Sequence, residues 1–239
     1  MSKSNLNGKT VFLTGATGGI GESIAHKLAS LGCNLVLTST DENRLSDLTN
    51  SLGSYDVNSD YFCADLRNIS EIYEAIDYVK INYGRVDILI NSAGIFPNST
   101  LSESSDKLFY ETLDINFRSI FIFSREFSKA MIDNRWGRIV NIGSASSYSG
   151  YNETSLYCAS KHAVLGFSRS IHEELKDKNV RTFCISPSST KSKMGLNTKG
   201  QDYSTFLEPE DVAEYVAFAI SFESNIVTNE IFLKRMILR

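Results

Sequence analysis

The chain has 239 residues, of which 42% are hydrophobic and 22% charged, and its formal net charge is −4. This composition is ordinary for a globular protein, and the small negative charge gives no reason to expect a nucleic-acid partner. No apolar run approaches the roughly 18 residues that a membrane span requires, and residues 1–5 lack the apolar core of a signal peptide. We therefore expect one compact cytoplasmic domain over residues 1–239, with no membrane partner.

Short apolar runs alternate with longer amphipathic stretches along the chain. The runs predict strands at residues 11–13, 35–37, 61–64, 86–90, 138–142, 180–186 and 230–233. Helical periodicity predicts helices at residues 19–31, 41–52, 69–83, 105–134, 155–176 and 209–222, and the fourth is long enough to contain a bend. The alternation predicts an α/β fold, a doubly wound parallel sheet of about seven strands with helices on both faces, of the Rossmann-like kind.

The first predicted strand and helix are joined by a glycine-rich turn with the sequence Thr14-Gly15-Ala16-Thr17-Gly18-Gly19-Ile20-Gly21. Glycines of such a turn permit a tight bend, a close approach of the backbone to a pyrophosphate, and close packing of the helix. The N–H groups and positive dipole end of the helix then attract the phosphate charge. The turn alone also suits an ordinary connection, but after the first strand of an alternating pattern it favours dinucleotide binding.

A hydroxyl, a phenol and an ammonium group follow the fifth predicted strand at Ser144, Tyr157 and Lys161. Tyr157 and Lys161 are one helical turn apart and therefore share a face. A phenol has a pKa of about 10, and we expect the nearby Lys161, with a positively charged nicotinamide, to lower it. Such a tyrosine can exchange a proton with a carbonyl oxygen that Ser144 also hydrogen-bonds. The Tyr-x-x-x-Lys pair alone is common on helix faces, so its combination with the glycine turn carries the prediction.

Together these motifs resemble those of the short-chain dehydrogenase/reductase family, of its shorter single-domain type, over nearly the whole chain. The turn resembles the family loop T-G-x-x-x-G-I-G, and residues 91–94 resemble N-N-A-G with Ser92 in place of the second Asn. The resemblance is closest to reductases of 3-oxoacyl thioesters and to sugar or polyol dehydrogenases. It implies that Asn116, Ser144, Tyr157 and Lys161 carry catalysis, with the helix at Asn116 bent around a water of the proton relay.

The resemblance also implies the cofactor site. Asp65 and Leu66 would hold the adenine, and Lys161 would hold the nicotinamide ribose. The implied cofactor-binding residues are Gly15, Thr17, Gly19, Ile20, Gly21, Ser39, Asp65, Leu66, Asn91, Ala93, Gly94, Tyr157, Lys161, Pro187 and Ser192. The four cysteines and three histidines show no metal-ligand spacing, so we expect no metal, reduced and mostly buried thiols, and surface or structural histidines.

The end of the second predicted strand bears on the choice of dinucleotide. Enzymes that prefer NAD usually place a carboxylate there, which accepts from the ribose hydroxyls and repels a 2′-phosphate. Here Ser39 occupies the selecting position, and Asp41 and Glu42 belong to the next helix. Hydroxyls can bond a phosphate, although no arginine stands at Gly18 or Thr40 to pair with it. We therefore expect NADP(H) in preference to NAD(H).

Two departures from the family pattern stand near the end of the chain. Pro187 is followed by Ser188 instead of glycine, and the C-terminal stretch from Ile231 to Arg239 lacks the family's usual Asp-Gly-Gly, which puts its tetramer contacts in doubt. Residues 187–209 are short and polar, and we expect them to form a substrate lid that suits a polar or carrier-linked substrate. Apolar side chains on the helices at 105–134 and 155–176, with the resemblance, imply a homodimer or homotetramer.

The leading hypothesis is hydride transfer between a nicotinamide and a carbonyl or secondary alcohol, with Tyr157 as general acid/base. One alternative is a non-catalytic nucleotide-binding or sensing module on the same fold, for which Ser144 and Tyr157 together would have no use. A second is a sugar-nucleotide epimerase, because Gly18 also makes the turn fit T-G-x-x-G-x-x-G. Too few residues follow Lys161 for the additional substrate domain of those enzymes.

Overall fold

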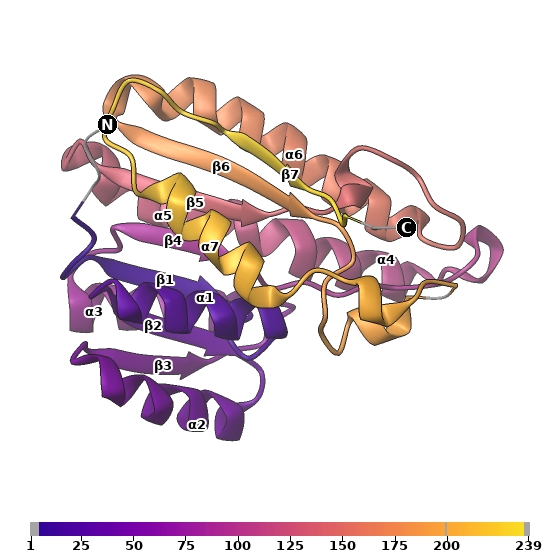
Figure 1. Ribbon diagram of the computed structural model, residues 1–239, viewed down its shortest axis with the longest axis horizontal. Helices are drawn as coiled ribbons and strands as arrows, with labels where there is room; N and C mark the ends of the chain where they lie inside the picture. Colours follow the sequence, from indigo (N-terminus) through magenta and orange to yellow (C-terminus); the bar gives the residue numbers. More distant parts are fainter. Residues whose placement is uncertain (1–4, 199, 237–239) are drawn as a thin grey trace.

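The computed structural model describes residues 5–198 and 200–236. Within them one parallel sheet has the strand order β3-β2-β1-β4-β5-β6-β7 (Figure 1). Its strands are β1 (Thr10–Thr14), β2 (Asn34–Ser39), β3 (Ser59–Cys63), β4 (Ile88–Asn91), β5 (Gly137–Ile142), β6 (Val180–Pro187) and β7 (Glu230–Leu233). The predicted doubly wound sheet of about seven strands is confirmed, with strand ends that differ from the prediction by at most two residues.

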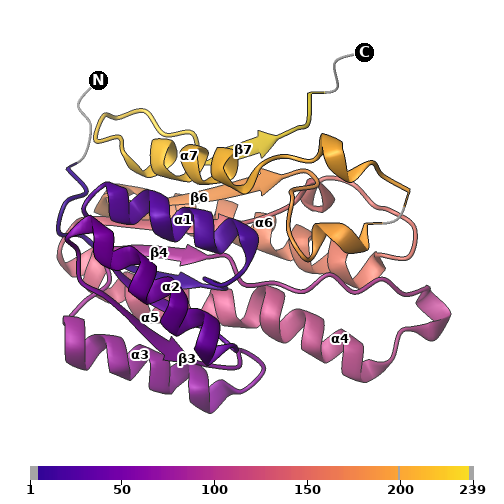
Figure 2. The ribbon, with the colours of Figure 1, turned by 60° about the horizontal axis from the view of Figure 1, so that its bottom comes forward.

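Helices cover both faces of the sheet (Figure 2). On one face lie α1 (Gly19–Ser30), α2 (Glu42–Leu52) and α7 (Pro209–Ile220), and α1 packs against α7. On the other lie α3 (Ile69–Tyr83), α5 (Ser119–Asp133) and α6 (Ser155–Leu175), while α4 (Asp106–Leu113) lies beyond the carboxyl ends of the strands. Each of the six predicted helices is present, and the fourth is divided.

The central strand β1 shows why the sheet is buried on both sides. Successive side chains of a strand point to opposite faces, and every residue of β1 is buried. Val11 and Leu13 belong to the core beneath α1, α2 and α7. Phe12 belongs to the opposite core, where its ring centroid lies 5.0 Å from that of Phe123 and 5.1 Å from that of Phe127. Continuous burial of this kind is typical of a parallel sheet between two helical layers.

The bend predicted within residues 105–134 is confirmed as a π-helical segment, Asp114–Arg118, between α4 and α5. Its wider turn is closed by a hydrogen bond from the Ser119 N–H to the Asp114 carbonyl, five residues back. The extra residue brings Asn116 into the interior, where its side chain is fully buried. Because π-helical turns are rare and occur mostly at functional sites, this segment draws attention to the adjoining edge of the sheet.

All strands run in one direction, so the loops that follow them meet at one edge of the sheet, where ligands of open α/β sheets bind. Among the described residues, no helix has the length and apolar character needed to cross a bilayer. Cys33, Cys158 and Cys184 are buried free thiols, while Cys63 is exposed at the end of β3. The expectation of mostly buried, reduced cysteines therefore holds with one exception.

Candidate active site

A single long cleft of about 1270 Å³ runs along the carboxyl edge of the sheet. Pockets for ordinary small ligands measure roughly 300–1,000 Å³, so this cleft suits a dinucleotide together with a second molecule. Its wall contains most of the residues that the sequence singled out: Gly15, Thr17, Gly19, Ile20, Gly21, Ser39, Asp65, Leu66, Ala93, Gly94, Ser144, Tyr157, Lys161, Pro187 and Ser192. Asn91 and Asn116 are absent from this wall.

The glycines of the β1–α1 turn meet the requirements expected of them. Gly15 has a φ of +66°, in the left-handed region, and a Cβ there would lie 2.6 Å from the Ala93 Cα. A Cβ on Gly21 would lie 2.2 Å from the Gly15 carbonyl oxygen, so only glycine allows α1 to pack this closely on the turn. Gly19 faces the lid, where the Lys191 carbonyl oxygen would be 3.2 Å from an added Cβ.

The polar groups that follow β1, β2 and β3 on the cleft wall fit a dinucleotide. Helix α1 begins after Gly18, and no side chain caps its first turn, so its N–H groups are available to a pyrophosphate. The Thr38 hydroxyl oxygen is buried on the cleft wall and has no hydrogen-bond partner among the described residues. The Asp65 carboxylate accepts hydrogen bonds from the Arg67 guanidinium, the shortest at 2.5 Å, and they lower its pKa. It is therefore a fixed anion beside the expected adenine position.

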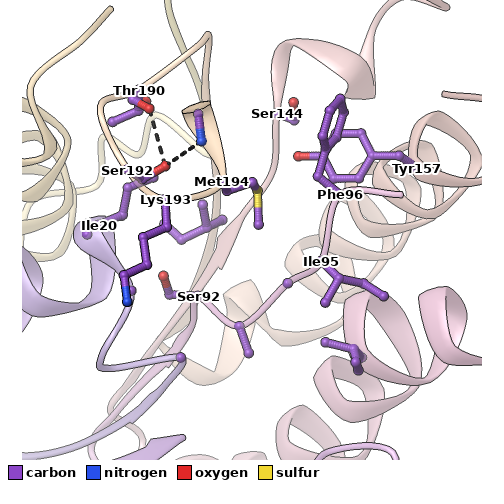
Figure 3. A pocket seen from close by; sticks show the side chains of 18 of the residues that line it. Ile20, Ser92, Ile95, Phe96, Ser144, Tyr157, Thr190, Ser192, Lys193 and Met194 are labelled. Atoms are coloured by element: carbon purple, nitrogen blue, oxygen red, sulfur yellow. Dashed lines mark hydrogen bonds between the residues drawn. The ribbon is translucent and has the colours of Figure 1, made fainter. Parts of the chain in front are cut away.

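The phenol of Tyr157 is buried at the middle of the cleft, with 7% of the residue exposed. Figure 3 shows its hydroxyl pointing toward Ser144, while Phe96 meets its ring edge-on with centroids 4.8 Å apart. Lys161 lies one turn further along α6, 5.7 Å from the centre of the Tyr157 ring. Its ammonium group donates a hydrogen bond of 2.8 Å to the Ile142 carbonyl at the end of β5. The structure thus brings the three predicted groups together.

The position of Ser144 is set by a short 3-10 turn, Ala145–Ser147, that follows β5. The Ser144 hydroxyl oxygen accepts a hydrogen bond from the Ser146 N–H at 3.1 Å. In return the Ser144 N–H donates to the Ser147 hydroxyl oxygen at 3.2 Å, which completes a capping box. Neither bond uses the Ser144 hydroxyl proton, so this group can donate it to the Tyr157 oxygen or to a substrate oxygen.

Burial governs the ionisation of both groups. It raises the pKa of the Tyr157 phenol above its ordinary value, an effect that the hydrogen bond with Ser144 opposes. Burial also lowers the pKa of the Lys161 ammonium to about 8. In the chain by itself desolvation of the phenolate is therefore the dominant influence on the pKa of Tyr157. The lowering expected from Lys161 together with a positively charged nicotinamide concerns the enzyme with cofactor and stays a prediction.

Asn91 and Asn116 are buried and do not line the cleft, and their expected roles stay predictions. The Asn116 amide is bonded to both backbone groups of Ile95, accepting at 2.8 Å and donating at 3.0 Å, and it also donates to the Ser160 hydroxyl. The Asn91 amide donates to the Asn141 side chain at 2.8 Å. Both residues fix the loop after β4 and the strand beside it.

Residues 187–209, the expected lid, contribute to the cleft wall beyond the end of β6; position 199 lies outside the described residues. That they act as a lid stays a prediction. The Ser192 hydroxyl accepts from the Gly195 N–H at 2.9 Å and donates to the Thr190 carbonyl at 3.3 Å, as the dashed lines of Figure 3 show. These bonds fold the segment into a tight turn. The Lys191 ammonium is paired with the Glu208 carboxylate outside the cleft wall.

Four cations on the cleft wall are not among the site residues predicted from the sequence: Arg44, Arg67, Lys193 and Arg235. Arg44 projects from the first turn of α2, 3.7 Å from the Glu22 carboxylate, and Arg67 is bonded to Asp65. Lys193 follows Ser192, and Figure 3 shows it extending from residues 187–209 toward Ile20 and Ser92. Arg235 follows the last strand. Only their positions in space place these side chains at the cleft. Among the described residues, no group of His, Cys, Asp or Glu could hold a metal.

A doubly wound sheet with a glycine turn after its first strand, and a buried tyrosine between serine and lysine on the same cleft, defines an NAD(P)-dependent oxidoreductase. A family model for short chain dehydrogenases matches residues 9–202. The chain therefore belongs to the short-chain dehydrogenase/reductase family. This membership agrees with the resemblance that the sequence motifs carry.

Relatives and solved structures give the same result. The chain is 33% identical over 235 residues to a 3-oxoacyl-[acyl-carrier-protein] reductase of Rickettsia felis, with 95% of each chain covered. It is 30% identical to a 2,3-dihydro-2,3-dihydroxybenzoate dehydrogenase of Bacillus subtilis, also with 95% of each covered. A metagenomic short-chain oxidoreductase crystallised with NADP has a TM-score of 0.87 and 27% identity, covering 98% of this chain and 100% of its own. A Burkholderia cenocepacia short chain dehydrogenase in complex with NADP also has a TM-score of 0.87, with 26% identity and coverage of 96% and 98%.

Proposed function

We propose that this enzyme transfers a hydride reversibly between NADP(H) and a carbonyl or secondary alcohol, with Tyr157 as general acid/base. The observation that carries the proposal is the buried Tyr157 phenol, aimed at Ser144 and backed by Lys161 on the wall of a cleft sized for a dinucleotide and a substrate. The complete set argues against a non-catalytic binding module. A binder would need Lys161 but would gain nothing from Ser144 and Tyr157 together.

The residues of the cleft divide the work of the reaction between them. The nicotinamide, when bound, supplies or accepts the hydride. In the reducing direction Ser144 donates a hydrogen bond to the carbonyl oxygen, and Tyr157 donates its proton to that oxygen as its charge develops. Lys161 holds the ribose hydroxyls and stabilises the resulting phenolate, and its own proton is held against the Ile142 carbonyl. Asn116 acts as a positioning residue through its bonds to Ile95.

The rest of the cleft would bind the dinucleotide. The uncapped first turn of α1 at Gly19 to Gly21 suits the pyrophosphate, and Lys193 extends over the same region from the lid. Asp65 and Leu66 suit the adenine, while Ala93 and Gly94 border the expected nicotinamide ribose beside Lys161. A Cβ on Gly94 would lie 3.8 Å from the Lys161 ammonium nitrogen, which supports a shared ribose site.

The preference for NADP(H) is supported by Ser39, by the unpartnered Thr38 hydroxyl and by Arg44 on the same stretch of wall. We expect kcat/KM with NADPH to exceed that with NADH under equal conditions. Ser39→Asp should lower the NADPH value about tenfold or more and spare NADH, because a carboxylate there repels the 2′-phosphate. Ser39→Ala is the matched control, since it removes the hydroxyl without adding charge. Higher efficiency with NADH in the unchanged enzyme would contradict the preference.

The relatives of this chain bear on the class of substrate that it uses. They include a 3-oxoacyl-[acyl-carrier-protein] reductase, which supports a small or carrier-linked carbonyl substrate. The test is a panel of 3-oxoacyl thioesters, sugars and polyols, followed by nicotinamide absorbance with saturating cofactor. We expect turnover with at least one class. Tight dinucleotide binding without turnover of any member would favour the sensing module instead.

We also expect a homodimer or homotetramer. Phe121 on α5 is 41% exposed, and its ring lies 6.2 Å from that of Phe167 on α6, which makes an apolar surface across the two helices. Burying such a surface against a second copy is favourable. Light scattering at micromolar concentration should report a dimer or tetramer, and Phe121→Glu should shift it toward the monomer. A monomeric unchanged protein would remove the expectation.

A further inference from the structure

The two departures from the family pattern meet in space. The chain continues past β7 to Arg235, whose backbone N–H donates a hydrogen bond of 3.2 Å to the Ser188 hydroxyl oxygen. Ser188 stands where the family has glycine after Pro187, and Arg235 lies in the C-terminal stretch that lacks Asp-Gly-Gly. Both residues line the cleft. The place where this chain departs from the family pattern therefore carries a long cationic side chain on the cleft wall.

The Arg235 side chain is held in place from the lid. Its Nη1 donates to the Thr205 hydroxyl oxygen at 3.0 Å, and its guanidinium lies 5.3 Å from the centre of the Phe206 ring. With the backbone bond to Ser188, these contacts fix the side chain at three points. A guanidinium that is already oriented loses little conformational entropy when it binds a ligand.

The charge of Arg235 is not neutralised by its neighbours. Among the described residues, no carboxylate lies within ion-pairing distance of it. Asp202 is near enough for Arg235 to contribute to the lowering of the Asp202 pKa, but that carboxylate accepts hydrogen bonds from the Ser204 N–H and hydroxyl. The guanidinium uses one of its five N–H donors on Thr205, so the others can serve a ligand.

The strand order places Arg235 on the substrate side of the cleft. In the sheet β3-β2-β1-β4-β5-β6-β7, the proposed adenine site follows β3, and the glycine turn follows β1. Ser144, which follows β5, and Pro187, which ends β6, border the reacting end. Arg235 follows β7, beyond both of them. A dinucleotide that extends from β3 to β5 therefore leaves Arg235 facing the second molecule.

We propose that Arg235 binds an anionic group, a carboxylate or a phosphate ester, on the substrate of this enzyme. The inference rests on the proposed function and names its substrate class, an anionic carbonyl compound or alcohol. Carboxylates and phosphates match the planar fork of a guanidinium and form charge-assisted hydrogen bonds with it. Partial burial at the base of the lid strengthens such a bond by reducing solvent screening.

The test uses the enzyme saturated with NADPH and the variants Arg235→Gln and Arg235→Lys. Gln retains a donor for Thr205 without charge, and Lys retains charge without the fork. Lys234→Gln is the matched control, because Lys234 is exposed, stacks on Phe232 and does not line the cleft. Binding of malonate and of inorganic phosphate is measured by titration, with the fluorescence of bound NADPH as the signal. Two pairs of substrates are then compared, each with an anionic and a neutral member. The first pair is acetoacetate and methyl acetoacetate, and the second is dihydroxyacetone phosphate and dihydroxyacetone.

We expect one anion to bind the unchanged holoenzyme about tenfold or more tightly than it binds the Arg235→Gln enzyme. The affinity of Arg235→Lys should lie between the two, and that of Lys234→Gln should equal that of the unchanged enzyme. Malonate as the better ligand identifies a carboxylate, and phosphate identifies a phosphate ester. KM for the matching anionic substrate should rise in Arg235→Gln. The value of kcat, the KM of the corresponding neutral substrate and the Kd of NADPH should stay unchanged. Equal binding of both anions by the unchanged and Gln enzymes would overturn the inference. Arg235-dependent anion binding without any carbonyl turnover would refute the proposed function and leave the anion site standing.

Discussion

Tyr157→Phe is expected to lower kcat about 10²- to 10⁴-fold, the range in which a positioned general acid or base contributes. The ring keeps its place against Phe96, since the substitution removes only the hydroxyl that points toward Ser144. The Kd of NADPH, measured by fluorescence in the absence of substrate, should stay within about fivefold, because a single neutral hydrogen bond contributes roughly 1 kcal/mol. Chemistry and cofactor binding should therefore separate in this one variant.

The matched control is Tyr215→Phe, which removes a phenol hydroxyl from the exposed face of α7, away from the cleft. Its kcat should equal that of the unchanged enzyme. Residual turnover of Tyr157→Phe within about fivefold of normal would remove the assigned role, because general acid/base catalysis accounts for more than that. A large loss of NADPH affinity in the same variant would instead assign Tyr157 to cofactor binding.

The order and type of the elements could be predicted because each level of the sequence agreed with the others. Val11 to Leu13 is a short apolar run between turn residues, and α1 carries apolar residues at helical spacing, as an α/β unit requires. The site was accessible for a related reason. Parallel strands deliver the residues after each strand to one edge, so Ser144 and Pro187 could be assigned to one cleft from chain position alone.

What could not be predicted depends on side-chain contacts between distant segments. The part of Asn116 in the reaction stays a prediction, whereas the bonds of its amide to the backbone of Ile95 could not be read from any local pattern. The pKa of Tyr157 depends on how deeply the phenol is buried, which no local pattern reports. The hydrogen bond between Arg235 and Ser188 joins two positions 47 residues apart in sequence. Motifs indicate which residues belong to a site, whereas burial and contacts between distant segments of the chain determine what each residue does there.

Lys161→Met is expected to abolish turnover and yet to stabilise the enzyme without cofactor by about 2 kcal/mol at pH 7. Burial lowers the pKa of Lys161 from its ordinary 10.5 to about 8. Lys161 therefore binds its proton less tightly in the folded protein than in the unfolded chain, and the charged side chain destabilises the fold. A tenfold change in proton affinity corresponds to about 1.4 kcal/mol, which makes the charged state cost roughly 3 kcal/mol below pH 8. Lys161→Met removes this cost but also the hydrogen bond to the Ile142 carbonyl, which reduces the stabilisation by about 1 kcal/mol.

The pH dependence separates this cause from a general packing effect. Between pH 8 and 10.5 the unfolded chain binds the proton and the folded protein does not, so the unchanged enzyme gains stability as pH rises through this window. The advantage of Lys161→Met, measured by urea unfolding at one protein concentration, should therefore be largest at pH 7 and fall to zero or below near pH 10.5, where only the loss of the bond to Ile142 remains. Lys107→Met, at a side chain that is 84% exposed, should change stability by less than about 0.5 kcal/mol at either pH. An advantage that stays constant with pH would show that Met packs better than Lys, and a Lys161→Met enzyme less stable at pH 7 would show that the buried ammonium is compensated. Stability given up at this position is the expected counterpart of holding a cation where the ribose and the phenolate need one.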